Sequence, residues 1–384
     1  MQRTDFKESA SGRLLRNERG YWAFVPNPLP PAIPASWELA AVTSQADRAL
    51  SRLAGAGQNL PNPHLLIHPF MRREAVLSSR IEGTQASLAD LLLFEGSKEN
   101  LQRTPDVREV FNYVLALEQT RERMKKLPLS LRLIREMHAR LLQGVRGERL
   151  TPGEFRRSQN WIGPPGCTLN EATFVPPPVT EMQHALGDLE TYLHADSSFP
   201  PLIRLAMIHY QFEAIHPFLD GNGRIGRLLL VLLLELEGLL PLPLLYLSAY
   251  FERNRQEYYH HLLAVSQAGA WERWITFFLR GVTEQAQDAL RRSQRLLDLR
   301  QQYTKRFQSA RSSGLLQKLV DQLFSSPAIS IGMAASVLGI TWTAAQHHVR
   351  NLVLAGILKQ VGSGKRNRLF MASKILAILE APEA

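Results

Sequence analysis

The sequence predicts a mainly α-helical protein, and three observations lead to this prediction. Most of the 384 residues place apolar side chains at three- and four-residue spacing, the period of an amphipathic helix. One stretch, 151–178, instead carries β-type residues around a Pro-Pro-Gly tip and ends in three prolines, which predicts an irregular hairpin or flap. The segment after residue 310 combines short helical patterns with two short β-type runs, so we expect a separate domain there.

Prolines and glycines divide the helical part of the chain into elements. The segment 27–34 holds four prolines in eight residues and marks the end of an extended N-terminal arm. Helical patterns then follow one another, and they resume after Gly223. The predicted helices span 38–55, 65–82, 87–96, 105–126, 129–144, 180–195 and 200–214, and a connecting helix spans 282–308.

The C-terminal segment has the pattern of a winged helix. A helix over 315–325 precedes a short helix over 331–338, and Thr341 or Thr343 caps a third helix that ends near Gly356. Two β runs around a Gly-Ser-Gly turn come next. A helix–turn–helix followed by a two-stranded wing is typical of winged-helix domains.

Composition excludes several classes of protein. A hydrophobic fraction of 45% with 21% charged residues excludes a wholly disordered chain. The single cysteine, Cys167, excludes an internal disulfide framework and fits a reducing compartment. The N-terminus is too polar for a secretory signal, and the most apolar stretch, 228–247, contains glutamates and prolines that disfavour a membrane span. We therefore expect a cytoplasmic protein with no membrane partner.

The net charge of +10 predicts attraction to nucleic acid, nucleotides or an acidic protein face. From Arg311 onward there are eight Lys or Arg and three Asp or Glu residues. Lys365, Arg366 and Arg368 cluster at the predicted wing, and Arg350 lies on the predicted recognition helix. This favours DNA contacts at these four residues; protein docking or dimer support is the alternative use of the same fold.

A twelve-residue string, HPFLDGNGRIGR from His216 to Arg227, carries the predicted chemistry at a junction between two helices. Glycines on both sides of Asn222 let the backbone approach a phosphate, and the start of the following helix attracts anions. Arg224 and Arg227 lie three residues apart, so both guanidinium groups can hold successive phosphates from one helix face. Asp220 is a candidate Mg²⁺ ligand, and His216 is a candidate general base.

This string resembles the signature of the Fic family, His-x-Phe-x-(Asp or Glu)-Gly-Asn-Gly-Arg-x-x-Arg, at every defined position. TPGEFRRSQNWIG is similar to the family's flap, which clamps a target segment, and TFVPPP to its continuation. YLSAYFERNRQEYYHHL resembles the segment that reaches the adenine. The resemblance covers about residues 35–310. It implies a Fic-type helical core with a β-hairpin flap and transfer of AMP from ATP to a hydroxyl of a protein side chain.

The resemblance also implies a role for each matched residue. His216 would take the proton of the attacking hydroxyl, and Asp220 would hold Mg²⁺ between the α- and β-phosphates. Arg224 would contact the β-phosphate and Arg227 the γ-phosphate, while Phe218 would be a buried anchor. The remaining implied site residues are Gly221, Asn222, Gly223, Ile225 and Gly226 at the phosphates, Ile162, Gly163, Pro164 and Pro165 in the flap, and Tyr258 and Tyr259 beside the adenine.

A second string concerns control. Residues 78–83, SSRIEG, fit the family's inhibitory motif, (Ser or Thr)-x-x-x-Glu-(Gly or Asn), with Ser78, Glu82 and Gly83 at its defined positions. By the resemblance, Glu82 would pair with Arg227 and occupy the place of the γ-phosphate, as in the N-terminally inhibited class. The alternative is an ordinary exposed glutamate at a helix end, where the helix dipole does not favour it.

These observations predict three regions and one main function. We expect an N-terminal arm and inhibitory region over 1–100, a catalytic domain over 101–310 and a winged helix over 311–384. The hypothesis is an autoinhibited AMP transferase that uses ATP and Mg²⁺ on an unidentified target protein or on itself, as a homodimer. The alternatives are a hydrolase of the same fold that removes AMP, and a DNA-binding regulator whose catalytic motif senses nucleotide.

Overall fold

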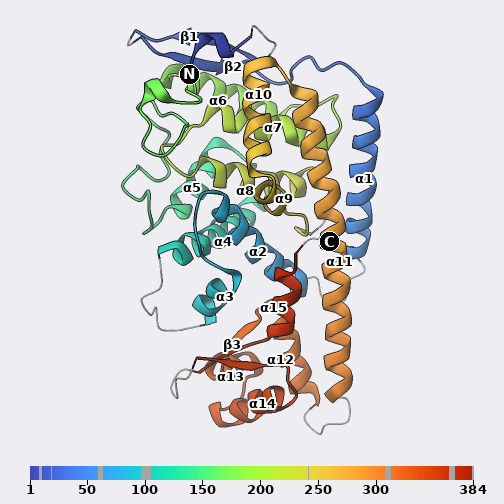
Figure 1. Ribbon diagram of the computed structural model, residues 1–384. Helices are drawn as coiled ribbons and strands as arrows, with labels where there is room; N and C mark the ends of the chain where they lie inside the picture. The colour runs from blue at the N-terminus through green and yellow to red at the C-terminus, as the bar shows by residue number, and fades with distance from the viewer. Residues whose placement is uncertain are drawn as a thin grey trace. The chain divides into compact units, whose positions relative to one another are not determined.

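A computed structural model describes residues 1–7, 11–18, 20–58, 64–96, 105–240, 242–307, 313–362 and 368–382. Helices make up most of these residues (Figure 1), so the predicted fold class is confirmed. The chain folds into two compact units, each assembled from segments that are distant in sequence. Unit 1 contains Met1–Ser51, Asn112–Leu239 and Leu247–Glu284, and unit 2 contains Arg52–Phe111, Leu240–Tyr246 and Gln285–Ala384.

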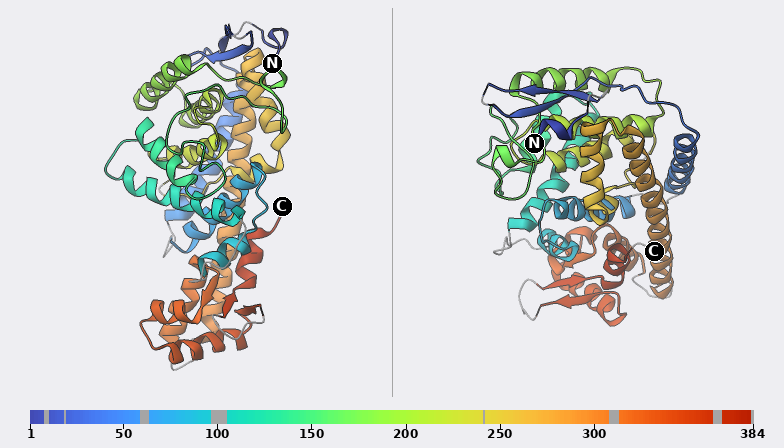
Figure 2. Two further views of the ribbon diagram at one scale, coloured as in Figure 1. Left: turned by 90° about the vertical axis from the view of Figure 1, so that its left-hand side faces the viewer. Right: turned by 45° about the horizontal axis from the view of Figure 1, so that its top comes forward.

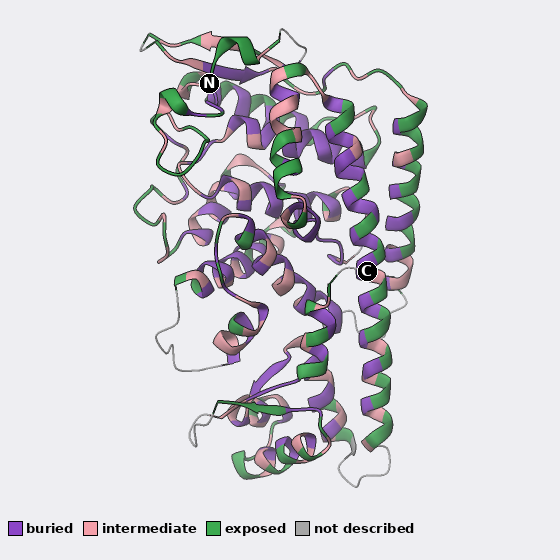
Figure 3. Ribbon diagram, in the orientation of Figure 1, coloured by how far each residue is buried: buried purple, intermediate pink, exposed green. Residues whose placement is uncertain are grey.

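Unit 1 is built around two buried helices. Helices α7 and α8 pack against each other, and Figure 3 shows both of them mostly as buried. Pro201 starts α7, a position where a missing N–H and a fixed φ suit a helix. The elements that lie wholly in unit 1 are η1 (Arg3–Asp5), β1 (Gly12–Arg16), β2 (Trp22–Pro26), α5 (Leu131–Leu141), η2 (Leu169–Glu171), α6 (Val179–His194), α7 (Pro201–Ile215), α8 (Asn222–Leu236), α9 (Ser248–Arg253) and α10 (Arg255–Ala268).

Part of the expected N-terminal arm is folded. Strands β1 and β2 form an antiparallel pair in which Leu14 lies opposite Phe24, visible in Figures 1 and 2. Phe24 is buried, and its N–H donates to the carbonyl of Val175 at 2.9 Å. The hairpin therefore packs on the end of the predicted flap, a contact between residues too far apart in sequence for the pattern to indicate.

The predicted flap, 151–178, is irregular as expected. Its only regular pairing among the described residues is a single antiparallel bridge between Ile162 and Phe174. The two residues exchange backbone hydrogen bonds of 2.8 and 3.0 Å, and the indole of Trp161 donates to the Cys167 carbonyl at 3.0 Å. The flap thus keeps its shape through a few local bonds instead of a ladder.

Unit 2 contains the predicted inhibitory segment and the C-terminal elements. Three helices run through both units: α1 (Trp37–Gln58), α4 (Pro105–Met124) and α11 (Trp271–Phe307). The last of these begins eleven residues before the predicted connecting helix. The elements wholly in unit 2 are α2 (His64–Ile81), α3 (Leu88–Gly96), α12 (Ser313–Ser325), β3 (Ala328–Ser330), α13 (Ile331–Leu338), α14 (Trp342–Leu354), β4 (Lys359–Val361), β5 (Leu369–Met371) and α15 (Ser373–Glu380).

The C-terminal elements follow the predicted order. Ser330 caps α13, and of the two predicted caps it is Thr341 whose hydroxyl accepts the N–H of Ala344 at 3.3 Å. The sheet order β3-β5-β4 is antiparallel throughout. Strand β3 and helix α15 were not predicted, and the assignment to the winged-helix class stays a prediction.

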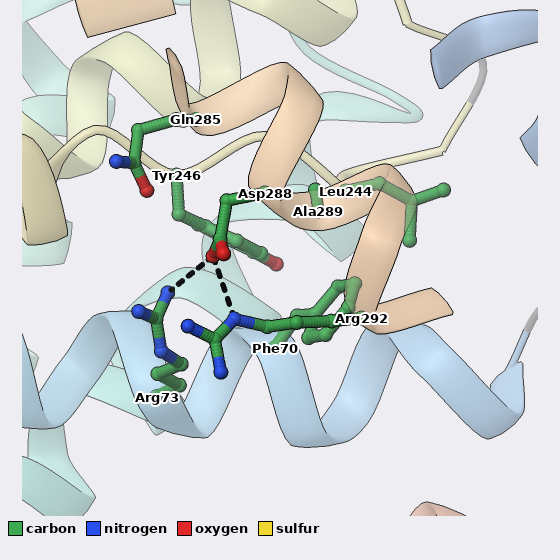
Figure 4. A pocket seen from close by; sticks show the side chains of 8 residues that line it. All are labelled: Phe70, Arg73, Leu244, Tyr246, Gln285, Asp288, Ala289 and Arg292. Atoms are coloured by element: carbon green, nitrogen blue, oxygen red, sulfur yellow. Dashed lines mark hydrogen bonds and ion pairs between the residues drawn. The ribbon is translucent and has the colours of Figure 1, made fainter. Parts of the chain in front are cut away.

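Asp288 and Arg292, both on α11, form a charged network inside unit 2, and Figure 4 shows the ion pairs of Asp288 with Arg292 and with Arg73 of α2. Its carboxylate lies 2.6 Å from the Arg292 guanidinium on α11 and 3.8 Å from Arg73 on α2. Arg292 also donates to the carbonyls of Ile378 and Ala381 at the end of α15, at 2.5 and 2.7 Å. Breaking a buried pair of this kind is costly, so the network holds α2, α11 and α15 together.

No helix of the described residues is long and apolar enough to cross a membrane. The stretch that looked most apolar in sequence, 228–247, forms the last turns of α8 and the irregular segment behind it. Most of its leucines are instead part of the buried core, which explains their density, while Leu236 is 53% exposed.

Candidate active site

The string from His216 to Arg227 forms a tight loop after α7, over 216–221, and then the first two turns of α8. His216 caps α7 in the left-handed conformation, with φ 48° and ψ 61°, and its N–H donates to the Phe212 carbonyl at 3.0 Å. Among the described residues, His216 and Thr151 are the two non-glycine residues with positive φ. Such a backbone costs about 1–3 kcal/mol and persists only where its surroundings impose it.

The side chain of Asn222 closes this loop on itself. Its Oδ1 accepts the N–H of Phe218, and its Nδ2 donates to the Phe218 carbonyl, both at 2.8 Å. The Phe218 side chain is fully buried, as expected of an anchor. Gly221 caps α8 with φ 79°, a conformation that favours glycine. The amide of Asn222 therefore fixes the loop. The anion site expected at the backbone N–H groups that start α8 stays a prediction.

Arg224 and Arg227 lie in the first two turns of α8 with only 1% and 2% of their surface exposed. Arg224 lies 3.5 Å from the Asp220 carboxylate. A positive charge interacts more strongly in a buried, low-dielectric setting than in water, and the helix start adds to it. The arrangement suits the successive phosphates of a nucleotide.

Asp220 is the candidate metal ligand. Its Oδ1 accepts the N–H of Gly221 at 2.6 Å, and its side chain is 30% exposed. Gly147 provides the space for the other oxygen, because a Cβ built there would lie 2.6 Å from Oδ2. No three His, Cys, Asp or Glu side chains of the described residues gather as a metal site. One accessible carboxylate fits Mg²⁺, which takes its other ligands from nucleotide phosphates and water.

Two flap residues that the sequence did not single out hold the loop from outside. Arg156 is 1% exposed, and it donates to the carbonyls of His216 at 3.0 Å and Pro177 at 2.5 Å. Asn160 donates to the carbonyls of His216 at 3.2 Å and Phe218 at 2.8 Å. Burial lowers the pKa of Arg156 to about 10, which leaves it charged at neutral pH. The first part of the flap, which carries Arg156 and Asn160, is thus hydrogen-bonded to the backbone of His216, the candidate general base, and of Phe218.

His138 of α5 is a third residue that sequence reasoning missed. It is fully buried and stacks on Phe218, with ring centroids 3.8 Å apart. Its ring nitrogens lie 2.8 Å from the Gly153 N and 3.0 Å from the Asp220 carbonyl. Burial is the main cause that lowers its pKa to about 4. Nothing in its sequence context marks it, because its partners come 15 and 82 residues later.

The two tyrosines expected beside the adenine have different surroundings. Tyr258 is 1% exposed, and its hydroxyl donates at 2.7 Å to His209, whose other nitrogen donates to the Gly226 carbonyl. Burial and the charge of Arg227 lower the pKa of His209 to about 3. Tyr259 is 42% exposed and lines a surface pocket with Pro164 of the flap. Tyr258 is thus part of the core, and Tyr259 is the one that offers an accessible ring.

The flap tip is exposed along its length. Ile162, Gly163, Pro164 and Pro165 are all exposed, and Ile162 keeps 39% of its surface in solvent. An apolar side chain exposed at the tip of a loop is available to another chain.

The predicted inhibitory residues surround the end of α2 in unit 2. Ser78 is fully buried, and Glu82 and Gly83 follow the last helical residue, Ile81. Gly83 has φ 97°, so this position ends the helix in the way a glycine allows. The predicted DNA contacts are divided: Arg350 is exposed on α14, Arg368 is half-buried, and Lys365 and Arg366 lie outside the described residues.

The protein is mainly helical, and its candidate site is a loop that begins at His216 and leads into the N-terminus of α8. A helix N-terminus attracts anions. Residues 40–122 match the model of the Fic/DOC family N-terminal region, and residues 128–234 match that of the Fic/DOC family itself. The chain belongs to the Fic/DOC family.

Curated relatives carry the name protein adenylyltransferase Fic. The relative from Drosophila grimshawi is 30% identical over 205 residues, which cover 53% of this chain and 38% of the relative. The relative from Drosophila virilis is 32% identical over 167 residues, which cover 43% of this chain and 30% of the relative. The chain therefore spans well under half the length of these relatives.

Two solved structures share the fold. A Fic family protein from Desulfovibrio desulfuricans G20 has a TM-score of 0.57 at 16% identity, over 90% of this chain and 98% of that one. A fragment of Fic-1 from C. elegans has a TM-score of 0.50 at 21% identity, over 66% of this chain and 73% of that one.

Proposed function

We propose that this chain is a protein adenylyltransferase, which moves AMP from ATP to a hydroxyl of a protein side chain. The observation that carries this proposal is the loop in which a strained His216 precedes buried Arg224 and Arg227 at the start of α8. The names of the curated relatives support the same activity. A base beside a cluster of phosphate-binding cations is what displacement at phosphorus requires.

The hydrogen bonds of His216 indicate which ring nitrogen acts. Its Nδ1 lies 3.3 Å from the Glu213 carbonyl, which can only accept, so Nδ1 carries the proton and Nε2 is the basic nitrogen. Nε2 takes the proton of the target hydroxyl, whose oxygen attacks the α-phosphorus. The bond from that phosphorus to the bridging oxygen breaks, and pyrophosphate leaves with its charge offset by Arg224 and Arg227.

Mg²⁺ fits this proposal as the ion held by Asp220. When bound, it would neutralise charge on the nucleotide phosphates. The side chain of Asp220 reaches solvent, and its second oxygen lies in the space left by Gly147. For the other end of the nucleotide we assign Tyr259, since it shares a pocket with flap residue Pro164. The exposed flap tip, 162–165, is assigned to the target protein.

We further propose that Glu82 restrains this activity. The support is the motif formed by Ser78, Glu82 and Gly83 at the end of α2, and the bracing of α2 in unit 2 through Arg73 and Asp288. By its charge, Glu82 would compete with the γ-phosphate for Arg227. ATP bound without that contact would present its α-phosphate poorly for in-line attack.

The test uses ATP radiolabelled at the α-phosphate with Mg²⁺. The chain, Glu82→Gly and the double variant Glu82→Gly/His216→Ala are compared for label on protein, first on themselves and then in a cell extract. We expect faint labelling by the unchanged chain, strong labelling by Glu82→Gly and none by the double variant. Equal labelling by the first two would refute the restraint, and labelling by the double variant would refute the role of His216.

A DNA contact through the C-terminal elements is a second candidate. Helix α14 presents an exposed face that includes Trp342, which is 54% exposed, and Arg350. The surplus of basic residues beyond Arg311 would attract a polyanion. A gel-shift assay with duplex DNA at low salt tests it: we expect a shift that weakens with salt and with Arg350→Ala. Absence of a shift at low salt would end this candidate.

A further inference from the structure

His138 has a fixed protonation pattern set by its two neighbours. The N–H of Gly153 points at Nδ1 at 2.8 Å, so Nδ1 accepts and holds no proton. Nε2 then carries the proton and donates to the carbonyl of Asp220 at 3.0 Å. Both polar atoms of a fully buried ring are therefore engaged, one by the flap and one by the metal-binding residue.

The ring plane is fixed as well. His138 and Phe218 stack with an interplanar angle of 6°, so the imidazole cannot turn without displacing the anchor of the loop. Gly221 lies against the same ring, since a Cβ built at this glycine would be 3.6 Å from Nε2 of His138. This is ordinary van der Waals contact, so glycine is favoured at 221 by its φ of 79° and not by a lack of space.

These contacts act on Asp220 from three sides. His138 holds its carbonyl, the Gly221 N–H holds Oδ1 at 2.6 Å, and Gly147 leaves room for Oδ2. Among the described residues outside 216–227, His138 supplies the side-chain hydrogen bond that reaches Asp220. It also joins Asp220 to Gly153 at the start of the flap, whose tip is assigned to the target.

We propose that His138 is a positioning residue, which aims the Asp220 carboxylate at the metal and fixes the start of the flap relative to it. This inference rests on the proposed adenylyltransferase function. Groups that orient a metal ligand commonly change metal affinity by about 10–100-fold when removed. His138 makes no contact with nucleotide in this account; its effect passes through Asp220.

The experiment titrates Mg²⁺ into the full chain saturated with ADP and follows binding by calorimetry. His138→Phe keeps a flat ring against Phe218 and loses both hydrogen bonds. We expect its Mg²⁺ affinity to fall at least about tenfold. His138→Gln keeps an N–H donor that can reach the Asp220 carbonyl, and it is expected to recover most of this loss.

Asn112→Leu is the matched control, because Asn112 is also buried and donates to the carbonyls of Leu141 and Gln143 at the end of α5. It should lower the melting temperature without changing Mg²⁺ affinity. Unchanged affinity in His138→Phe, or an equal loss in Asn112→Leu, would overturn the proposal. Because ADP and Mg²⁺ binding needs no AMP transfer, this outcome is separate from failure of the proposed function.

Discussion

The protein holds two of its segments with different firmness. One is 216–227, a loop followed by the first turns of α8, and the other is the flap tip 162–165. In the first segment, Phe218 exchanges two hydrogen bonds with Asn222, and the two arginines are buried. At the flap tip, the described residues form a single β-bridge, between Ile162 and Phe174, and all four tip residues are exposed. Catalytic groups need fixed geometry, whereas a surface that meets another chain tolerates adjustment. The difference fits the proposed division of roles, in which 216–227 does the chemistry and the flap tip meets the target.

The largest effect is expected inside the loop. Asn222→Ala removes both bonds to the Phe218 backbone, so His216 and Arg224 lose their relative placement. In the Glu82→Gly background we expect the AMP-transfer rate to fall at least about 100-fold, since small misplacements cost that much. Asn170→Ala, at an exposed asparagine of the flap, is the control and should keep the rate. Comparable losses in both variants would show that the loop is not specially fixed.

Within the flap, the buried Arg156 and the exposed Arg157 allow the same comparison between a firmly held residue and a loosely held one. Arg156→Ala removes the buried donor of the Pro177 carbonyl and one of the two donors to the His216 carbonyl, the other being Asn160. This should lower the free energy of unfolding by about 3 kcal/mol. Arg157 keeps 88% of its side chain in solvent, so Arg157→Ala should change it by less than about 0.5 kcal/mol. Urea unfolding measures both. A similar loss of unfolding free energy in both variants would contradict the view that Arg156 holds the flap to the backbone at His216.

A third prediction concerns pH and His209, which packs under the loop. Its pKa is about 3 in the folded chain and 6.5 as the ordinary value, so below pH 6.5 the unfolded chain binds the extra proton. The contribution of neutral His209 to the free energy of unfolding is therefore fully present above pH 6.5. It falls as the pH drops toward 3, by about 2 kcal/mol between pH 7 and pH 5. Melting temperatures at the two pH values should differ less in His209→Asn. An equal difference would exclude His209 as the cause.

The smallest effect on the protein itself is expected at the flap tip. Ile162→Ala removes an exposed side chain, so the free energy of unfolding should change by less than about 0.5 kcal/mol. ATP affinity should stay the same, while labelling of target proteins in an extract should fall. Lost ATP affinity or a marked loss of stability would show that the tip belongs to the nucleotide site or the core.

The sequence predicted what neighbouring residues determine. Most helices, the irregular flap and the loop that begins at His216 depend on local spacing, and the structure has them near the predicted positions. The exceptions are α11, which begins eleven residues before the predicted helix, and β3 and α15, which were not predicted. His138, Arg156 and Asn160 act on the loop from 56 to 82 residues away, a relation that no local pattern contains. The burial of Tyr258 likewise comes from tertiary packing on His209, which its neighbour Tyr259 does not share.

The most direct test of the account compares two labels on one variant. Glu82→Gly is incubated with Mg²⁺ and ATP that is radiolabelled at either the α- or the γ-phosphate, and modified protein is weighed by mass spectrometry. If the chain transfers AMP through His216, label comes from the α-phosphate alone and the mass increases by one AMP, and both are lost with His216→Ala. Label from the γ-phosphate, or modification that persists without His216, would contradict it.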